Sequence, residues 1–231
     1  MLWHPVKQNS EEPCECCGKT WMQLRRGLVT SSNVAQVMAY HNQPNKFGDP
    51  AKRLAADIAT VMAGGEMTEN PYQSADMARG HINEPLARRR YEQWYPEKYG
   101  DFITVEPGGF YADTATGASP DGLVGDDGLI EIKDVINSVH LANIERGKLD
   151  PAYRWQIPML LMQSGRQWVD WVSHCATMPK RRRLFVVRLT RRQLAEDIRA
   201  IQKRLEKFWG AEPSYYKPTE EATWLGLTRQ S

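Results

Sequence analysis

Apolar residues recur along the chain with two different spacings, which predict strands through the middle of the chain and helices around them. Short apolar runs and period-two alternation favour strands at residues 102–105, 110–112, 123–125, 129–133, 167–175 and 184–189. Apolar residues three and four apart favour helices at residues 33–40, 49–63, 74–94, 137–146, 151–162 and 194–210. Strands interspersed with helices are typical of α/β proteins, so we expect a central mixed β-sheet flanked by helices.

The stretch from Ser119 to Lys133 has the pattern of a β-hairpin that carries charged side chains. Its two apolar runs are separated by Gly-Asp-Asp-Gly at residues 125–128, a composition that favours a tight turn. Folding the runs onto each other returns Asp121 to the side of Glu131 and Lys133. Because side chains alternate along a strand, Glu131 and Lys133 share one face, while the neighbouring isoleucines face the other and can be buried.

Two carboxylates and an amine at this spacing suggest phosphodiester chemistry. Cross-strand Cβ atoms lie about 5 Å apart, so the carboxylates of Asp121 and Glu131 repel each other unless a cation lies between them. Ligand sets made only of oxygen favour Mg²⁺ or Mn²⁺ over zinc. An adjacent lysine can orient or deprotonate a metal-bound water, or stabilise the negative charge that develops during attack on phosphorus.

These residues also match a known pattern. Pro120-Asp121 followed by Glu131-Ile132-Lys133 has the form P-D…(D/E)-x-K of a large nuclease superfamily. Upstream lies W-x-x-L-R-R-G-x-V-T-x-S at residues 21–32, and downstream lies Gln156 in an apolar helix. In order and spacing, these blocks resemble the phage lambda exonuclease (YqaJ viral recombinase) family, over about residues 21–209.

The resemblance implies a restriction-endonuclease-like core and an activity. We expect a Mg²⁺-dependent exonuclease that degrades one strand of double-stranded DNA in the 5′-to-3′ direction, from a 5′-phosphorylated end to mononucleotides. Two Mg²⁺ ions are expected per active site, with Mn²⁺ as a possible substitute. The family also implies a ring-shaped homotrimer and a phage single-strand annealing protein as partner, for homologous recombination.

The resemblance further assigns roles to individual residues. It gives catalytic or metal-binding roles to Lys133, Asp121, Glu131, Glu84 and Gln156, and metal coordination to the backbone carbonyl of Ile132. It assigns the 5′-phosphate to Arg25 and Ser32, and Ser119 is a further candidate. Thr30, Ser31 and Ser32 offer hydroxyl caps for the helix predicted to start at residue 33, whose amides would also attract an anion.

Each assignment has a structural alternative. Arg25 could be a solvent-facing arginine beside an ordinary capped helix, and Gln156 a satisfied polar group in the core. Glu84 precedes Pro85, which kinks a helix or marks its restart, so Glu84 could only favour a helix N-terminus electrostatically. For the whole chain, the alternatives are an endonuclease of the same superfamily and a non-catalytic DNA-binding subunit. The sequence contains no phosphate-binding loop of the Gly-x-x-x-x-Gly-Lys-Ser/Thr type, so we expect no ATP-driven movement.

Length and charge agree with one nuclease domain over residues 1–231. We expect an irregular N-terminal arm at residues 1–19 and a C-terminal tail at residues 211–231 that docks onto the body or onto a neighbouring subunit. The net charge of +2 excludes a diffuse polycation, so a DNA-binding surface requires clustered basic residues, as at residues 88–90 and 180–183. The sequence has no run of eighteen apolar residues and no signal-peptide core, which favours a cytoplasmic protein without membrane contact.

Three of the four cysteines lie close together, at Cys14, Cys16 and Cys17. A zinc site would normally show a second pair of cysteines or histidines, and recruiting His4 or His81 would be needed here. We therefore predict reduced thiols that bind no metal.

Overall fold

The structure is a computed structural model that describes residues 1–65 and 75–210. Its strands form two mixed β-sheets flanked by helices, which confirms the predicted α/β class but divides the expected central sheet in two. The C-terminal tail predicted at residues 211–231 lies outside the described residues. Among the described helices, none combines the length and apolar character that crossing a bilayer requires.

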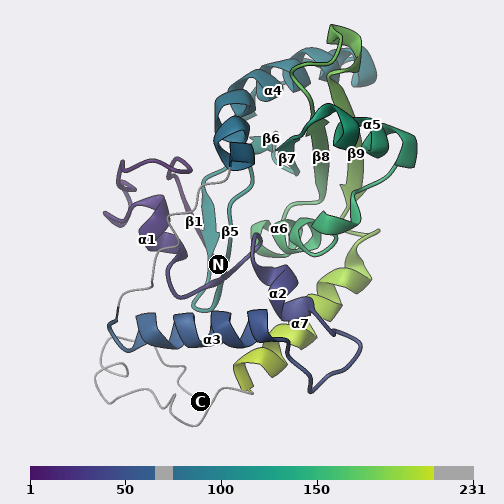
Figure 1. Cartoon of the computed structure of the whole chain (residues 1–231). Helices are drawn as coiled ribbons and strands as arrows, with labels where there is room; N and C mark the ends of the chain where they lie inside the picture. Colours follow the sequence, from purple (N-terminus) through teal and green to yellow (C-terminus); the bar gives the residue numbers. More distant parts are fainter. Residues whose placement is uncertain (66–74, 211–231) are drawn as a thin grey trace.

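The larger sheet has five strands in the order β3-β6-β7-β8-β9 (Figure 1). The strands are β3 (Val105–Glu106), β6 (Gly122–Val124), β7 (Gly128–Asp134), β8 (Trp168–His174) and β9 (Leu184–Thr190). Only β7 and β8 run parallel, and the predicted hairpin of β6 and β7 pairs Gly122 with Ile130 and Val124 with Gly128. The short 3-10 helix η2 (Lys180–Arg182) lies in the connection between β8 and β9.

Helices cover both faces of this sheet. On one face, α4 (Ala75–Tyr99) buries Tyr91 against Ile130, Ile132 and Val172. On the other, α6 (Gln156–Ser164) packs against Trp171 and its neighbours. The helix α5 (Asn137–Arg146) connects to β8 through a hydrogen bond between His140 Nδ1 and Ser173 Oγ. Because helices cover both faces, the first five residues of β7 are all buried, and even Glu131 is only 2% exposed.

The smaller sheet has the order β1-β4-β5-β2 and corrects the prediction of an irregular N-terminal arm. Its strands are β1 (Leu2–His4), β4 (Phe110–Ala112), β5 (Thr116–Ala118) and β2 (Val29–Thr30). β1 pairs antiparallel with β4, and Val6 and Cys14 are buried against Phe110 and Trp21. A strand of three residues is too short to show a period, so only tertiary pairing reveals it.

Four helices pack beside and below the smaller sheet in the view of Figure 1. They are α1 (Trp21–Arg25), α2 (Val34–Met38), α3 (Asp49–Met62) and α7 (Ala195–Gly210). Arg204 of α7 is 3% exposed and donates to the carbonyl oxygens of the loop around α2. These acceptors are Val37, Ala39, Gln43, Pro44 and Lys46. The guanidinium therefore replaces water for five carbonyl groups and fixes the path of the chain after α2.

Several predicted boundaries are wrong for local reasons. The helix predicted at 33–40 covers only Val34–Met38, with Asn33 at its N-cap and no capping hydroxyl, because Thr30 belongs to β2. The helix predicted at 151–162 divides into η1 (Pro151–Tyr153) and α6, which begins at Gln156. In contrast, Pro85 and Pro96 lie inside one continuous helix, α4.

Candidate active site

Asp121 lies immediately before β6, the strand between β3 and β7 in the five-stranded sheet. The Asp121 backbone N–H donates to the carbonyl oxygen of Ile130 at 3.1 Å, which extends the β6–β7 pairing by one residue. The Asp121 carboxylate then turns back and accepts from the Ile132 backbone N–H at 2.6 Å. This confirms the predicted position of Asp121 beside the segment from Glu131 to Lys133.

Glu131 projects from β7 toward α6. Its Oε1 atom accepts from Lys133 Nζ and from Gln156 Nε2, both at 2.7 Å. Its Oε2 atom is buried and has no hydrogen-bond partner within the described part of the chain. Burial, and then the charge of Asp121, raises the pKa of Glu131 to about 8. Gln156 therefore reaches the site from the first residue of α6, whereas the sequence predicted it in the middle of a helix over residues 151–162.

Lys133 forms an ion pair with Glu131 and also interacts with the charge of Asp121. Burial alone would lower the pKa of Lys133, but the negative charges of Glu131 and Asp121 outweigh it and raise that pKa above its ordinary value. The ammonium also lies 5.0 Å from the ring centroid of Tyr153. Lys133 is thus a cation in the folded chain at neutral pH.

Glu84 comes from α4, which packs on the face of the sheet opposite to α6. Its side chain is 25% exposed, and it accepts from Arg88 Nη2 at 2.8 Å. The same Arg88 atom donates to the backbone carbonyl of Asp121 at 2.6 Å, so Arg88 ties Glu84 to the hairpin. Burial, and then the charge of Asp121, raises the pKa of Glu84 to about 7. Glu84 and Asp121 line the same cleft.

The N-terminal segment also contributes to the site, which sequence reasoning missed. Gln8 Nε2 donates to the carbonyl oxygens of Ser119 and Pro120, each at 3.0 Å, directly before Asp121. Gln8 lines a cleft of about 310 Å³ together with Glu84 and the hairpin. The remaining lining residues are Gly80, His81, Asp121, Ile132, Lys133, Asp134 and Tyr153.

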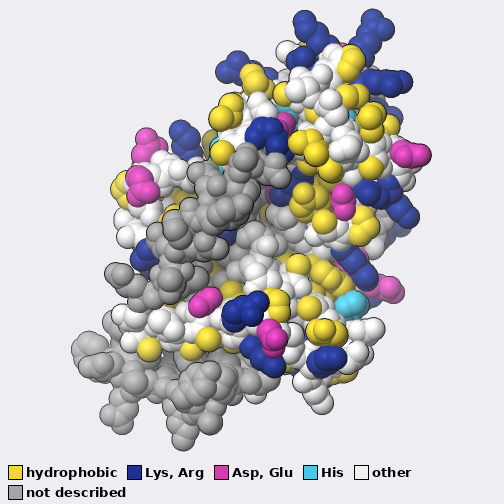
Figure 2. All heavy atoms as spheres, in the orientation of Figure 1, with side chains coloured by type: hydrophobic (Ala, Val, Ile, Leu, Met, Phe, Trp, Pro, Cys, Tyr) yellow, Lys and Arg dark blue, Asp and Glu magenta, His cyan; other side chains and the backbone are white. Residues whose placement is uncertain are grey.

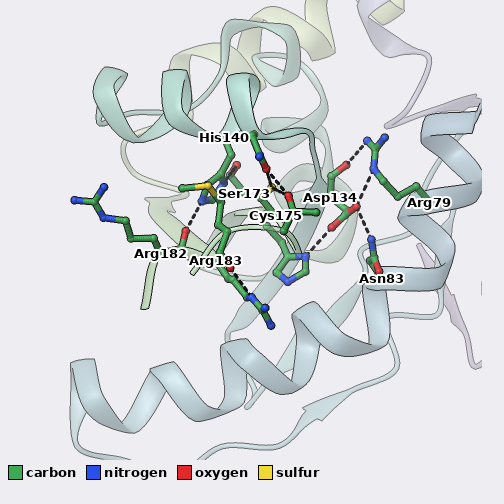
Figure 3. Close-up of polar contacts among 12 residues, drawn as sticks. Arg79, Asn83, Asp134, His140, Ser173, Cys175, Arg182 and Arg183 are labelled. Carbon is green, nitrogen blue, oxygen red and sulfur yellow. Dashed lines mark hydrogen bonds and ion pairs between the residues drawn. The ribbon is translucent and has the colours of Figure 1, made fainter. Parts of the chain in front are cut away.

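A buried polar network fixes the start of α4 against the end of β7 (Figure 3). The Asp134 carboxylate accepts from Arg79 Nε at 3.1 Å, from Asn83 Nδ2 at 2.9 Å, and it contacts His174 Nδ1 at 2.7 Å. Burial would raise the pKa of Asp134, but these hydrogen bonds outweigh burial and lower it. Because Asn83 precedes Glu84, this network sets where Glu84 enters the cleft.

Arg25 and Ser32 lie together, as the resemblance implied. Arg25 Nη2 donates to Ser32 Oγ at 2.8 Å, and the guanidinium lies 4.1 Å from the ring centroid of Trp21. No ion pair links Arg25 to an acidic side chain in the part of the chain that the structure describes. Burial lowers the pKa of Arg25 to about 10, so an anion beside it would relieve an unfavourable desolvation.

Ser119 connects this basic group to the hairpin. Its hydroxyl accepts from Trp21 Nε1 at 3.0 Å and donates to the Gly109 carbonyl oxygen at 2.7 Å. The structure thus places Ser119 behind Trp21, whose ring carries the Arg25 guanidinium.

The donor set fits a divalent cation. Asp121, Glu131 and Glu84 supply only carboxylate oxygens. Within residues 1–65 and 75–210, the buried Oε2 atom of Glu131 lacks the hydrogen-bond partner that buried polar atoms normally have. Burial raises the pKa of Glu131 and of Glu84, repulsion from Asp121 adds to the rise, and a cation would offset both effects. Hard oxygen donors suit Mg²⁺ or Mn²⁺.

Comparison with known proteins agrees with this geometry. Residues 20–167 match the model of the YqaJ-like viral recombinase domain, and this range includes the hairpin, Arg25 and Glu84. The chain belongs to the YqaJ-like viral recombinase family. This confirms the resemblance to the YqaJ family that the sequence blocks indicated.

Solved structures extend the likeness of this YqaJ-family chain. The alkaline exonuclease LHK-Exo from Laribacter hongkongensis is 31% identical, with a TM-score of 0.64, over 87% of this chain and 96% of that one. A complex of LHK-Exo with dAMP matches equally well. A phage-related exonuclease from Haemophilus somnus 129PT, at 12% identity and a TM-score of 0.55 over 78% of this chain and 91% of that one, shares the fold. No curated protein matches the sequence.

Proposed function

We propose that this YqaJ-family protein is a Mg²⁺-dependent 5′-to-3′ exonuclease that degrades one strand of double-stranded DNA, from a 5′-phosphorylated end to mononucleotides. The observation that carries the proposal is the cluster of Asp121, Lys133 and Glu131. Asp121 and Lys133 line the cleft, and Glu131 contacts Lys133 while its Oε2 atom is buried without a hydrogen-bond partner among the described residues. LHK-Exo is an alkaline exonuclease, which supports the reaction, and its complex with dAMP supports a mononucleotide product.

The carboxylates of Asp121, Glu131 and Glu84, with the backbone carbonyl of Ile132, would hold Mg²⁺, or Mn²⁺ in its place, at up to two positions. When bound, the cations supply Lewis-acid stabilisation of the charge on phosphorus and lower the pKa of the attacking water. Gln156 keeps the Glu131 carboxylate in one orientation through its bond to Oε1. Arg88 performs the same task for Glu84.

Lys133 acts as a positive charge. Its ammonium is 2.7 Å from Glu131 Oε1 and lies in a cleft that also includes Asp121, so it remains protonated. Its three N–H groups can orient a water for in-line attack and stabilise negative charge that grows on the phosphoryl oxygens. The proton of the attacking water would leave to solvent or to a phosphate oxygen of the DNA. As the new P–O bond forms, the bond from phosphorus to the 3′ oxygen of the terminal nucleotide would break, and solvent would protonate that oxygen.

The Arg25–Ser32 pair supplies polarity in this proposal. A guanidinium that pairs with no described carboxylate, next to a hydroxyl, suits a terminal phosphate. Ser119 positions this pair through Trp21. Because a 5′-phosphate held there would lie at one end of the scissile strand, hydrolysis would begin from 5′ ends.

The proposal includes a DNA-binding surface and the assembly that the family resemblance implies. Lys and Arg side chains gather over the upper part of the molecule, the region of α4, β8 and β9 in Figure 1 (Figure 2). Exposed members include Arg89, Lys180, Arg181 and Arg182. We propose that this surface contacts the DNA backbone, that a ring-shaped homotrimer encloses the duplex, and that a single-strand annealing protein receives the exposed strand for recombination.

One assay tests the proposed function against its alternatives. Linear duplexes with and without 5′-phosphate, carrying a label near either the 5′ or the 3′ end of one strand, are incubated with Mg²⁺ beside a closed circular duplex. We expect the 5′-proximal label to be released first as mononucleotide, a faster reaction with 5′-phosphate, and intact circles. Asp121→Asn should abolish release, whereas Asp126→Asn, in the exposed hairpin turn, should retain it.

Two outcomes would favour the alternatives. Nicking of the closed circle would indicate an endonuclease. DNA binding without cleavage under any divalent cation would indicate a DNA-binding subunit.

A further inference from the structure

The N-terminal segment brings three cysteines and one histidine to a single point. His4, at the end of β1, and Cys14, Cys16 and Cys17 have ligand atoms that all lie within 4.8 Å of one another. The shortest separations are 2.8 Å between the sulfurs of Cys14 and Cys16, and 3.2 Å between His4 Nδ1 and the sulfur of Cys16. His4 Nδ1 lies 3.6 Å from the sulfur of Cys17. The fourth donor that the sequence lacked is therefore supplied by strand pairing.

The backbone between these cysteines forms a tight turn. The N–H groups of Cys17 and Gly18 both donate to the carbonyl oxygen of Cys14, at 3.3 and 2.7 Å, and Cys14 N–H donates to Lys19 at 2.8 Å. Gly18 has φ of 69°, a left-handed conformation that glycine adopts without strain. The turn therefore keeps the three cysteines on one compact loop.

We propose that His4, Cys14, Cys16 and Cys17 bind one structural Zn²⁺ ion. Three thiolates and one imidazole are a ligand set that zinc takes in closed tetrahedral sites, and Cys14 and Cys17 have the C-x₂-C spacing of such sites. With Zn–S of about 2.3 Å and Zn–N of about 2.0 Å, a tetrahedron separates its ligand atoms by about 3.5–3.8 Å. The four donors need to move by only about 1 Å or less to reach that geometry. This assignment replaces our expectation of thiols that bind no metal.

The zinc site would join the two parts of the N-terminal segment that meet the active-site hairpin. On one side, Trp3 of β1 donates to the carbonyl of Gly108, and Gly108 passes so close to Pro120 that a Cβ would lie 1.7 Å from the Pro120 oxygen. On the other side, Lys19 leads into the capping box of Thr20, which starts α1 and its Arg25. Gln8 lies in the loop between the ligands. Zinc would therefore hold both Gln8 and α1 in place against Asp121.

The environment favours a structural ion over a catalytic one. Cys14 is 2% exposed and packs in the cluster of Val6, Trp21, Leu24 and Phe110. All four donors come from protein, which leaves no coordination position for a substrate. The site is also separate from the carboxylate cluster, whose oxygen ligands select harder cations.

Metal content of the full chain tests the proposal. The protein is purified with excess Mg²⁺ to saturate the carboxylate site, and zinc is measured by inductively coupled plasma mass spectrometry. We expect one zinc per chain in wild type and in Asp121→Asn, and bands typical of tetrahedral thiolate coordination after Co²⁺ exchange. His4→Ala and Cys17→Ser should weaken zinc binding by more than about 100-fold, measured by competition with a chromophoric chelator. Cys175→Ser, a buried cysteine bonded to Asn137, is the matched control and should keep its zinc.

A second measurement does not depend on the variants being folded. Removing zinc from wild type with a chelator should increase amide hydrogen exchange at residues 5–19 and at the start of α1, and Zn²⁺ alone should restore protection. Wild type with less than about 0.1 zinc per chain after growth in zinc-supplemented medium, or with a disulfide among Cys14, Cys16 and Cys17 in its place, would overturn the proposal. Equal zinc affinity in wild type and His4→Ala would overturn it as well.

Discussion

The buried carboxylate of Glu131 predicts an unusual dependence of stability on pH. Its pKa is about 8 in the folded chain, against 4.5 for an ordinary glutamate. A carboxyl group with a raised pKa stabilises the fold in its protonated form. The contribution is therefore complete below pH 4.5 and is lost as pH rises through 8.

The size of this effect is large compared with the stability of a typical domain. The difference between 4.5 and about 8, at about 1.4 kcal/mol per pH unit, corresponds to about 5 kcal/mol as an upper limit. Domains are typically stable by about 5–15 kcal/mol. Without a cation, the protein should thus lose a substantial part of its unfolding free energy between pH 5 and pH 9, and Mg²⁺ should restore most of it at the alkaline end.

Glu131→Gln isolates this contribution. The variant keeps an acceptor oxygen for Lys133 and Gln156 but cannot ionise. Lys133 has a raised pKa, so its own contribution is constant below about pH 10 and leaves the slope unchanged. Urea unfolding in EDTA at pH 5 to 9 should give a steep fall for wild type and a shallower one for Glu131→Gln. Equal slopes, or a wild type that is as stable at pH 9 as at pH 6 without metal, would refute the reasoning.

Three further substitutions test other parts of the account. Arg25→Ala should reduce the preference for 5′-phosphate over 5′-hydroxyl ends by about 10- to 100-fold in kcat/KM, the value of a charge-assisted hydrogen bond, and an unchanged preference would contradict its role. Lys133→Met should lower the single-turnover rate of cleavage by about 100- to 1,000-fold, with little change in DNA affinity in a filter-binding assay. A loss of affinity without a loss of rate would argue for a binding role. Arg204→Met should lower the unfolding free energy measured in urea by about 3–5 kcal/mol, because buried carbonyl groups lose their hydrogen-bond donor. The control Arg199→Met, at an exposed position of the same helix, should change it by less than about 0.5 kcal/mol. Equal effects of the two substitutions would contradict the role of Arg204.

The parts of the site that could be predicted are local in sequence. Asp121, Glu131 and Lys133 lie within one hairpin, so a tight turn and strand alternation suffice to bring them together. Glu84 and Gln156 required the family resemblance, because nothing local links their helices to β7. The structure shows both at the site, while their roles, like those of Arg25 and Ser32, stay predictions.

The parts that were missed depend on distant pairing. Gln8 contacts Ser119 and Pro120 from more than a hundred residues away, and a single glutamine in a proline-containing segment carries no periodic signal. The ion pair between Arg88 and Glu84 was also missed, although Arg88 is the i+4 neighbour of Glu84, a spacing that favours an ion pair. The second sheet was missed because β1 and β2 are too short to show alternation, and with it the approach of His4 to the cysteines.

The most direct test of the central claim is the position of the divalent cation. Crystals of the protein grown with Mn²⁺ and measured near the manganese absorption edge locate the ion by its anomalous signal. The account predicts a peak coordinated by Asp121 and Glu131 Oε2, at about 2.1–2.2 Å from each oxygen. A fully active protein whose crystals show no ion between these two carboxylates would contradict it.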